Sequence, residues 1–263
     1  MKKVTAKYAT DISISAVSHG QIHLVEKLLC DIDQLCSEML LEFILTLNTE
    51  EELSFDPEEF GFPIKVIRNS VPIGFSANQN QAFLNSTGRY FCVINPDVRL
   101  SEEVFEVVLN CLQDISVGVA APLVVDRNGI IEDSARRFPT PFKILCKAFG
   151  GCKGSDYAVK NEIIYPDWVG GMFMLFRREV FEALGGFDER YFLYYEDVDL
   201  CARLRLRGYE VALCPNAKVI HHAHRSSHTS LKFMKWHLTS MARFFCSPPF
   251  LKIFWQRLVK SKP

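Results

Sequence analysis

Residues 90–97 read Y-F-C-V-I-N-P-D, and this stretch decides the fold class of the chain. An unbroken apolar run is typical of a strand covered on both faces, because a strand with one face in water alternates apolar and polar residues. Proline does not continue a central strand, so Asn95-Pro96-Asp97 ends it and leaves the Asp97 carboxylate just beyond. We therefore expect a buried, mostly parallel sheet that binds ligands at the carboxyl ends of its strands.

Strands and helices alternate on both sides of this stretch. Apolar runs predict further strands at 12–17, 41–47, 64–67, 117–125, 168–176, 209–214 and 217–220. Helical spacing, glycine boundaries and a possible cap predict helices at 22–39, 74–82, 101–112, 178–184 and 196–207. Residues 136–166 look irregular. This alternation favours an α/β fold with helices on both faces of the sheet.

Composition favours one main domain with a basic tail. The 263 residues are 48% apolar, which suffices for one α/β core and a small appendage. No Asp or Glu follows Glu210, although the formal net charge of the chain is only −1. We assign residues 1–225 to the α/β domain and residues 226–263 to a basic, aromatic tail, which Pro248-Pro249 divides into two expected helices.

The cysteines and the amino terminus bear on the compartment. Nine cysteines are scattered without a CxxC pair, which indicates reduced thiols in a cytosolic compartment. Lys7, Tyr8 and Asp11 interrupt the apolar stretch that a signal peptide would need, and no apolar run of about 18 residues occurs. We expect a cytoplasmic protein that is neither secreted nor membrane-spanning.

Carboxylates stand at two of the expected boundaries. Asp97 offers a hard oxygen ligand that suits Mg²⁺ or Mn²⁺ carrying a diphosphate, although Asn95-Pro96-Asp97 could simply be a turn. Glu196-Asp197-Val198-Asp199 follows the aromatic run at 191–195, which would partly desolvate a carboxylate and fit it to act as a general base. The alternative is that these acids only stabilise the amino terminus of a helix.

Histidines and a glycine-opened helix complete the candidates. Three histidines within residues 221–224 follow a strand, and imidazole with carboxylate suits Mn²⁺, Fe²⁺ or Zn²⁺ better than Mg²⁺ alone, whereas a single histidine is more often structural. The segment G-F-S-A-N-Q-N at 74–80 opens a helix where phosphate or sugar hydroxyls could bind. An ordinary helix start explains that segment equally well.

Taken together, five motifs resemble family 2 glycosyltransferases. They are G-F-S-A-N-Q-N at 74–80, I-N-P-D-V at 94–98, W-V-G-G-M-F-M-L-F-R-R at 168–178, G-G-F-D-E-R-Y-F-L-Y-Y-E-D-V-D-L-C-A-R-L at 185–204 and V-I-H-H at 219–222. The match covers about residues 11–225 and is most similar to bacterial rhamnosyltransferases of O-antigen and cell-wall linker synthesis. The resemblance implies the Rossmann-like GT-A fold and inverting, metal-dependent transfer of a sugar from a nucleoside-diphosphate donor.

The resemblance also implies roles for residues at the matching positions. Asp97 would be the metal-binding acid of a degenerate DxD motif, with His221 as the second protein ligand of Mg²⁺ or Mn²⁺. Asp197 would be the catalytic base, which Glu196 would orient. The remaining matched residues would contact substrates: Gly74, Phe75, Asn78, Asn80 and Asn95 the donor, and Trp168, Gly170 and Gly171 the acceptor side of the cleft.

Two departures from the family pattern leave the nucleobase open. Pro72 stands where the family usually has Asn, and Leu47-Asn48-Thr49-Glu50 replaces the usual D-N-x-S after the second strand, although Asn48 could still bond a pyrimidine edge. By resemblance we expect dTDP-L-rhamnose as the donor and a polyprenyl-diphosphate-linked saccharide as the acceptor. A metal-dependent nucleotidyltransferase or diphosphate hydrolase, or an inactive sugar-binding protein, remains the alternative.

The tail predicts contact with an anionic membrane surface. Its aromatic residues alternate with cations and no anions, as in helices that lie in a membrane interface. The alternatives are a helical lid or dimer contact, or binding of nucleic acid. Because the implied acceptor is a lipid, we favour the inner face of the cell membrane and expect no nucleic acid partner.

Overall fold

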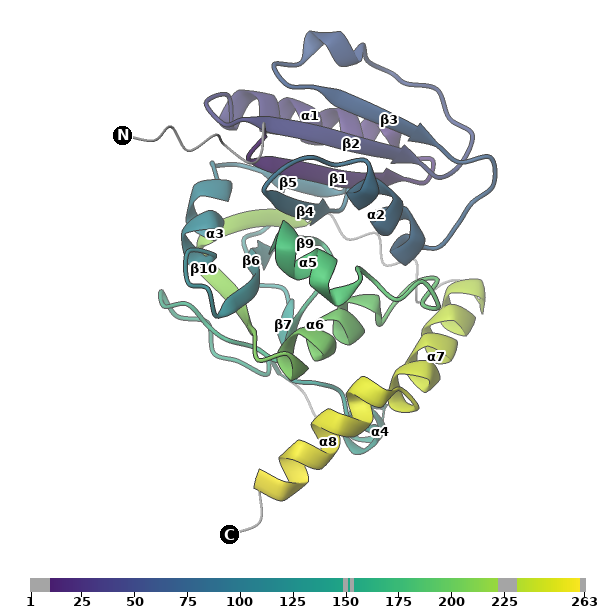
Figure 1. The fold of residues 1–263 in the computed structure, drawn as a ribbon, viewed down its shortest axis with the longest axis vertical. Helices are drawn as coiled ribbons and strands as arrows, with labels where there is room; N and C mark the ends of the chain where they lie inside the picture. Colours follow the sequence, from purple (N-terminus) through teal and green to yellow (C-terminus); the bar gives the residue numbers. More distant parts are fainter. Residues whose placement is uncertain (1–9, 149–150, 152–153, 222–230, 261–263) are drawn as a thin grey trace.

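The structure is a computed structural model that describes residues 10–148, 151, 154–221 and 231–260 (Figure 1). Its strands are β1 (Ile12–Ser18), β2 (Leu41–Leu47), β3 (Ile64–Arg68), β4 (Tyr90–Ile94), β5 (Val98–Leu100), β6 (Val117–Val125), β7 (Ala135–Arg136), β8 (Trp168–Val169), β9 (Phe173–Arg177) and β10 (Glu210–His221). Its helices are α1 (Ile22–Leu35), the short 3-10 turn η1 (Pro57–Glu59), α2 (Phe75–Leu84), α3 (Phe105–Cys111), α4 (Pro141–Ala148), α5 (Arg178–Leu184), α6 (Glu196–Leu206), α7 (Leu231–Phe245) and α8 (Pro248–Lys260).

One sheet of eight strands forms the centre, in the order β3-β2-β1-β4-β9-β6-β10-β5. Strands β1 to β4 are mutually parallel, as are β6 and β10, while β9 and β5 run antiparallel to their neighbours. Helices α1 and α3 cover one apolar face of the sheet, and α5 and α6 cover the other. The expected mostly parallel α/β fold is therefore confirmed.

Several expected elements differ from the structure. The run at 168–176 is broken into β8 and β9, because residues 170–172 leave the sheet to contact other loops. The two strands expected at 209–214 and 217–220 are one strand, β10, with a register shift between Cys214 and Lys218. The segment expected to be irregular at 136–166 contains helix α4, and the helix expected from Ser101 begins only at Phe105.

The tail folds back onto the domain. In Figure 1 helices α7 and α8 lie along one edge of the molecule, and Phe244, Phe250 and Ile253 are buried in the core cluster on the α6 side of the sheet. Helix α8 begins at the expected proline pair, because proline is tolerated where a helix starts. Helices α7 and α8 therefore pack against the domain through these buried side chains. The expected functional boundary at residue 225 falls outside the described residues and stays a prediction.

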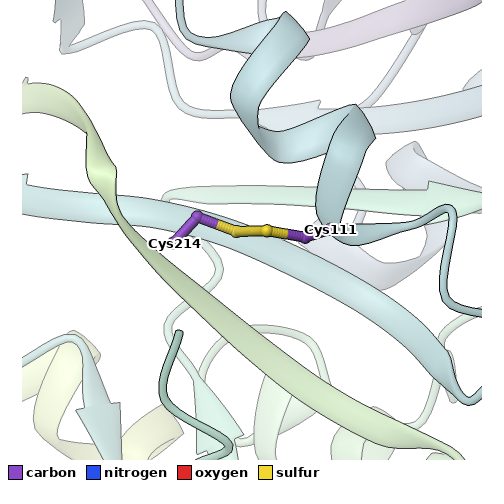
Figure 2. Close-up of a disulfide and its surroundings, with 2 residues drawn as sticks. All are labelled: Cys111 and Cys214. Atoms are coloured by element: carbon purple, nitrogen blue, oxygen red, sulfur yellow. A yellow bond between two sulfur atoms is a disulfide. The ribbon is translucent and has the colours of Figure 1, made fainter. Parts of the chain in front are cut away.

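One pair of cysteines departs from the expected reduced thiols. Cys111 of α3 and Cys214 of β10 form a disulfide (Figure 2). Helix α3 packs on β10, which brings together residues 103 positions apart in the sequence. Six other cysteines are free, namely Cys30, Cys36, Cys92, Cys146, Cys201 and Cys246. Cys152 lies outside the described residues.

None of the described helices combines the length and the apolar character needed to cross a bilayer.

Candidate active site

A short edge strand brings Asp97 and His221 together. Strand β5 pairs antiparallel with the end of β10, in a register that sets Val98 opposite His221. Asp97 precedes Val98, so its carboxylate reaches the imidazole, and Asp97 Oδ2 lies 3.4 Å from His221 Nε2. Arg99 anchors β5 to α1 through both carboxylate oxygens of Asp31. Two motifs far apart in the sequence thus meet at the edge of the sheet.

Glu132 contacts the other nitrogen of the same imidazole. After β6 the chain turns back at residues 126–129, and the Glu132 amide donates to the Val124 carbonyl, which places Glu132 beside β10. Glu132 Oε2 lies 2.9 Å from His221 Nδ1. Burial alone would lower the pKa of His221, but the hydrogen bonds and charges of Asp97 and Glu132 outweigh it and raise that pKa. The sequence gives no sign of this contact, because Glu132 and His221 are 89 positions apart.

The Asp97–His221 pair has ligand chemistry suited to a divalent cation. Asp97 Oδ1 is buried, and no hydrogen-bond donor of the described residues reaches it. A carboxylate oxygen beside an imidazole nitrogen suits Mn²⁺, and Mg²⁺ less strongly. No group of three or more His, Cys, Asp or Glu side chains that could hold a metal occurs among the described residues. The pair would therefore need further ligands from a substrate or water. His222 and His224 lie outside the described residues.

The loop at residues 170–172 connects Asp197 with the turn that carries Asp97. The Gly171 amide donates to Asp197 Oδ2 at 3.0 Å. The Asn95 amide donates to the carbonyl of Met172 at 2.9 Å. One loop therefore contacts both acidic motifs. Because residues 170–172 leave the sheet between β8 and β9, they are able to contact both motifs.

Glu196 and Asp197 begin α6 directly after two residues in left-handed conformation. Tyr194 and Tyr195 have φ of 69° and 66°, which is uncommon for residues other than glycine. Burial raises the pKa of Glu196, and the neighbouring Asp197 charge adds to this effect. Burial also raises the pKa of Asp197, although hydrogen bonds from Val198 and Gly171 oppose it. Glu196 and Asp197 therefore both bind a proton more readily than exposed carboxylates do.

Helix α2 interlocks with the loop before Glu196. A Cβ on Gly74 would stand 2.9 Å from Phe192 Cα, so only glycine allows the two backbones to approach this closely. The Phe75 amide donates to the Phe192 carbonyl at 2.8 Å. Asn80 bonds both backbone groups of Phe187, accepting from its amide and donating to its carbonyl. These contacts give Gly74, Phe75 and Asn80 a structural role, and their expected donor contacts stay predictions.

The side chains of Asn48 and Asn78 also have partners within the protein. Asn48 Oδ1 accepts from the Ile73 amide and from Asn69, while its amide group donates to the Ile73 carbonyl. Asn78 is fully buried and accepts from Asn69 at 2.7 Å. This network fixes the loop before α2. Contact of Asn48 or Asn78 with a donor remains a prediction.

A cavity of about 350 Å³ lies beside Asp197. Strand β7 pairs with β8 and sets Arg136 opposite Trp168, and both residues line the cavity. Arg137, Lys143 and Tyr195 line it as well. Trp168 thus lines a cavity beside Asp197, and its expected contact with the acceptor stays a prediction. The cationic residues were not predicted, because they fall in the segment that looks irregular.

Sequence comparison gives a family and two informative relatives. The family described as "Glycosyltransferase like family 2" matches residues 55–236. Rhamnosyltransferase WbbL of Escherichia coli (strain K12) is 26% identical over 247 residues, covering 89% of this chain and 92% of that protein. The N-acetylglucosaminyl-diphospho-decaprenol L-rhamnosyltransferase of Mycobacterium tuberculosis is 33% identical over 145 residues, covering 51% of this chain but only 47% of that protein.

Solved structures give the same fold. Mannosyltransferase PcManGT from Pyrobaculum calidifontis, in complex with GDP-Man and Mn²⁺, superposes with a TM-score of 0.61 at 17% identity. The match covers 92% of this chain and 69% of that one. The likeness shows the GT-A fold, and the expectation of that fold is confirmed.

Proposed function

Because this chain belongs to glycosyltransferase family 2, we propose that it transfers L-rhamnose from dTDP-L-rhamnose to a lipid-linked saccharide with inversion at the anomeric carbon. The observation that carries the proposal is one loop, residues 170–172, which contacts both the turn before Asp97 and the carboxylate of Asp197. Contact of this one loop with the Asn95 turn and with Asp197 supports a cation site and a base held near each other, as transfer between two bound substrates requires.

Asp97 and His221 would hold the divalent cation. The buried Asp97 Oδ1 without a hydrogen-bond partner among the described residues, next to an imidazole nitrogen, fits Mn²⁺ or Mg²⁺. Such a cation supplies positive charge that stabilises the departing nucleoside diphosphate. Asn95, one turn residue earlier, would contact the donor ribose.

Asp197 would accept the proton of the attacking acceptor hydroxyl. The Gly171 amide fixes one of its oxygens, and burial raises its pKa, which makes it a better proton acceptor than an exposed carboxylate. Glu196 lies buried beside it, with an oxygen that has no partner in the described structure, and would orient the base. A hydroxyl activated here attacks opposite the leaving group, so the configuration inverts.

The identities of donor and acceptor rest on the relatives. Both sequence relatives are named as rhamnosyltransferases, and the name of one includes an N-acetylglucosaminyl-diphospho-decaprenol. These names support a rhamnose donor and a polyprenyl-diphosphate-linked acceptor for this chain.

An exposed apolar stripe supports a location at the inner face of the cell membrane. Leu251, Trp255 and Val259 of α8 are four residues apart, so they share one helix face, and each is at least 46% exposed. Lys252 adds an exposed positive charge to the same helix. A helix with an exposed apolar stripe and cations is suited to an anionic membrane surface.

Product analysis tests the proposed reaction. The protein is incubated with dTDP-L-rhamnose, Mn²⁺ and a short-chain polyprenyl-diphospho-N-acetylglucosamine, and the released nucleotide is identified with and without the acceptor. We expect acceptor-dependent release of dTDP and a product enlarged by one rhamnose. Release of dTMP or of diphosphate would instead indicate attack at phosphorus by a nucleotidyltransferase or hydrolase, and donor binding without turnover would indicate an inactive sugar-binding protein.

A further inference from the structure

The cavity beside Asp197 is separate from the candidate cation site. Asp197 and Glu196 line it, whereas Asp97 and His221 do not. Its volume of about 350 Å³ falls in the range of small-ligand sites. If the donor diphosphate binds at the Asp97–His221 pair, then a ligand in this cavity is the other substrate.

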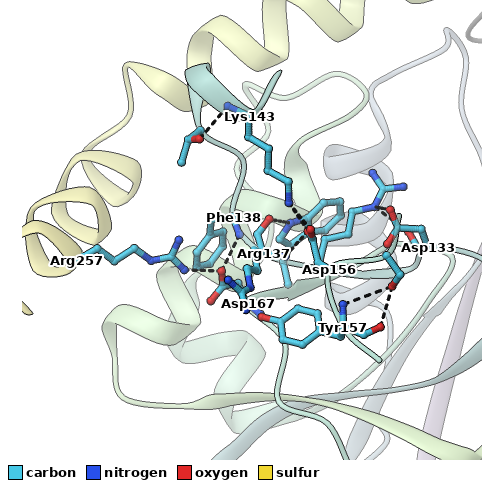
Figure 3. A network of polar contacts seen from close by, with 12 residues as sticks. Asp133, Arg137, Phe138, Lys143, Asp156, Tyr157, Asp167 and Arg257 are labelled. Atoms are coloured by element: carbon cyan, nitrogen blue, oxygen red, sulfur yellow. Dashed lines mark hydrogen bonds and ion pairs between the residues drawn. The ribbon is translucent and has the colours of Figure 1, made fainter. Parts of the chain in front are cut away.

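Three cationic side chains, Arg136, Arg137 and Lys143, line the cavity together with the carboxylates of Asp156, Glu196 and Asp197. Lys143 pairs with Asp156, as Figure 3 shows, so those two charges compensate each other. The Arg136 guanidinium lies over the Trp168 ring, 5.5 Å from its centroid, and pairs at 3.0 Å with Asp133, which is not among the lining residues.

Arg137 is the more available of the two arginines. Its guanidinium lies over the Tyr157 ring, 5.8 Å from the centroid, and no carboxylate of the described residues forms an ion pair with it. The backbone around it is fixed, because its amide donates to Asp156 and its carbonyl accepts from Trp168 Nε1. The backbone of Arg137 is thus held in place, and its planar guanidinium group can donate two parallel hydrogen bonds to a phosphate.

Aromatic side chains stand beside these cations. Trp168, Tyr194, Tyr195 and His237 line the cavity together with Asp197. Aromatic rings offer a flat apolar face to a sugar ring, while their polar atoms can bond its hydroxyls. The cavity therefore combines a surface for a sugar, a candidate base for one of its hydroxyls and cations for an anionic group next to the sugar.

We propose that this cavity binds the diphosphate-linked sugar of the acceptor, with Arg137 and Arg136 contacting the diphosphate. The inference rests on the proposed function and deepens it, because it assigns the recognised feature of the acceptor to named side chains. The diphosphate is recognised at the arginines, and the sugar hydroxyl lies toward Asp197.

Direct binding without donor tests the assignment. The probes are farnesyl-diphospho-N-acetylglucosamine and the matched farnesyl N-acetylglucosaminide without the diphosphate, each titrated calorimetrically into the full chain. For Arg137→Ala we expect Kd for the diphosphate probe to rise about 10- to 100-fold, the effect of losing one contact to a charged group. Binding of the probe without diphosphate should hardly change. Lys27→Ala, an exposed cation on α1, is the matched control and should bind both probes as the unmodified protein does.

The outcomes separate this inference from the proposed function. Equal affinity of unmodified protein and Arg137→Ala for the diphosphate probe overturns the inference, even if the protein releases dTDP. Arg137-dependent binding of the diphosphate probe by a protein that transfers no rhamnose supports the cavity assignment and overturns the proposed function. Arg137→Lys provides a second variant. It keeps the charge without the planar fork, so its Kd should fall between those of the unmodified protein and Arg137→Ala.

Discussion

His221 is held between two carboxylates, and each should affect a bound cation differently. Asp97 contacts Nε2 and would be a ligand, while Glu132 contacts Nδ1 and would fix the orientation of the ring. An imidazole that binds a metal commonly donates its other N–H to a carboxylate, and loss of that partner typically lowers metal affinity about 10- to 100-fold.

We therefore expect Glu132→Gln to weaken Mn²⁺ binding by about tenfold and Asp97→Ala to weaken it much more. Isothermal titration with MnCl₂ in the absence of sugar donor measures both affinities. Asp133→Asn, next in sequence but paired with Arg136, serves as the control and should leave the affinity unchanged. Unchanged Mn²⁺ affinity in Asp97→Ala would refute the assignment of the cation site.

Asp197 should be needed for proton transfer and not for donor binding. Asp197→Asn keeps the size of the side chain and can still accept from the Gly171 amide, but it does not take up a proton. We expect rhamnose transfer to fall about 10²- to 10⁴-fold, as for the loss of a general base. Affinities for dTDP-L-rhamnose and Mn²⁺, measured by titration, should stay within twofold of the unmodified protein. Retained transfer in Asp197→Asn would assign the base elsewhere.

At the scale of elements, a strand can be predicted from the sequence where it consists of a run of apolar residues. It is hard to predict where it forms only by pairing with a segment distant in the sequence. The run at 90–94 predicts β4 correctly, because burial on both faces leaves a local pattern. Strand β5 has only three residues, and its place depends on pairing with β10, which no local pattern indicates. The same reason hides Glu132 and the arginines of the cavity, whose contacts join segments that are distant in the sequence.

The close approach of α2 to the loop before Glu196 should make Gly74 sensitive to substitution. In Gly74→Ala the new Cβ would meet backbone atoms of Phe192, so one of the two segments must move. We expect a loss of stability of roughly 1–3 kcal/mol and a large fall in transfer, with Mn²⁺ affinity unchanged. Thermal unfolding and the transfer assay measure these effects. Val71→Ala, at an exposed position of the same connection, is the control, and equal activity of the two variants would show that α2 does not position the loop.

A buried carboxylate links three neighbouring strands of the sheet, β1, β2 and β3. Glu42 of β2 accepts from Ser13 of β1, from Lys65 of β3 and from Thr87 before β4. Burial alone would raise the pKa of Glu42, but these hydrogen bonds outweigh it and lower that pKa to about 2. A carboxyl group with a lowered pKa in the folded state stabilises the fold above its ordinary pKa, and this contribution is lost as the pH falls toward the folded value.

For Glu42→Gln we therefore expect a loss of roughly 2 kcal/mol at neutral pH, measured by urea unfolding. The difference from the unmodified protein should shrink between about pH 5 and pH 3, because Glu42 in the unfolded chain is protonated first. Glu52→Gln, at an exposed position after β2, is the control. A difference that stays constant over this range would mean that ionisation of Glu42 does not contribute.

At the scale of the whole molecule, α7 and α8 have an inner and an outer face with different roles. On the inner face, Ser240 donates to the Leu193 carbonyl at 2.8 Å, and Trp236 stacks on Phe192 with ring centroids 4.6 Å apart. These contacts reach the loop that leads into Glu196 and Asp197. Removal of both helices would expose buried Phe244 and disturb this loop, so a truncated chain does not test membrane binding by itself.

Substitutions on the outer face alone test the membrane proposal. We expect the triple variant Leu251→Ser, Trp255→Ser, Val259→Ser to lose binding to vesicles of phosphatidylglycerol by roughly tenfold or more, because each apolar side chain contributes about 1.5–3 kcal/mol when fully buried. Flotation measures the bound fraction, and binding of the unmodified protein should also weaken as salt rises.

The control for that experiment removes three exposed apolar side chains from other parts of the surface. Leu84→Ser, Ile115→Ser and Ile130→Ser alter three residues that are 82%, 80% and 64% exposed and lie on other elements or turns. Because serine at the outer positions of α8 leaves the buried Phe250 and Ile253 in place, the triple variant should keep its melting temperature and its transfer to a water-soluble acceptor. Transfer to an acceptor embedded in vesicles should then fall with the bound fraction. If the α8 variant and the control float equally well, the outer face of α8 does not bind the membrane.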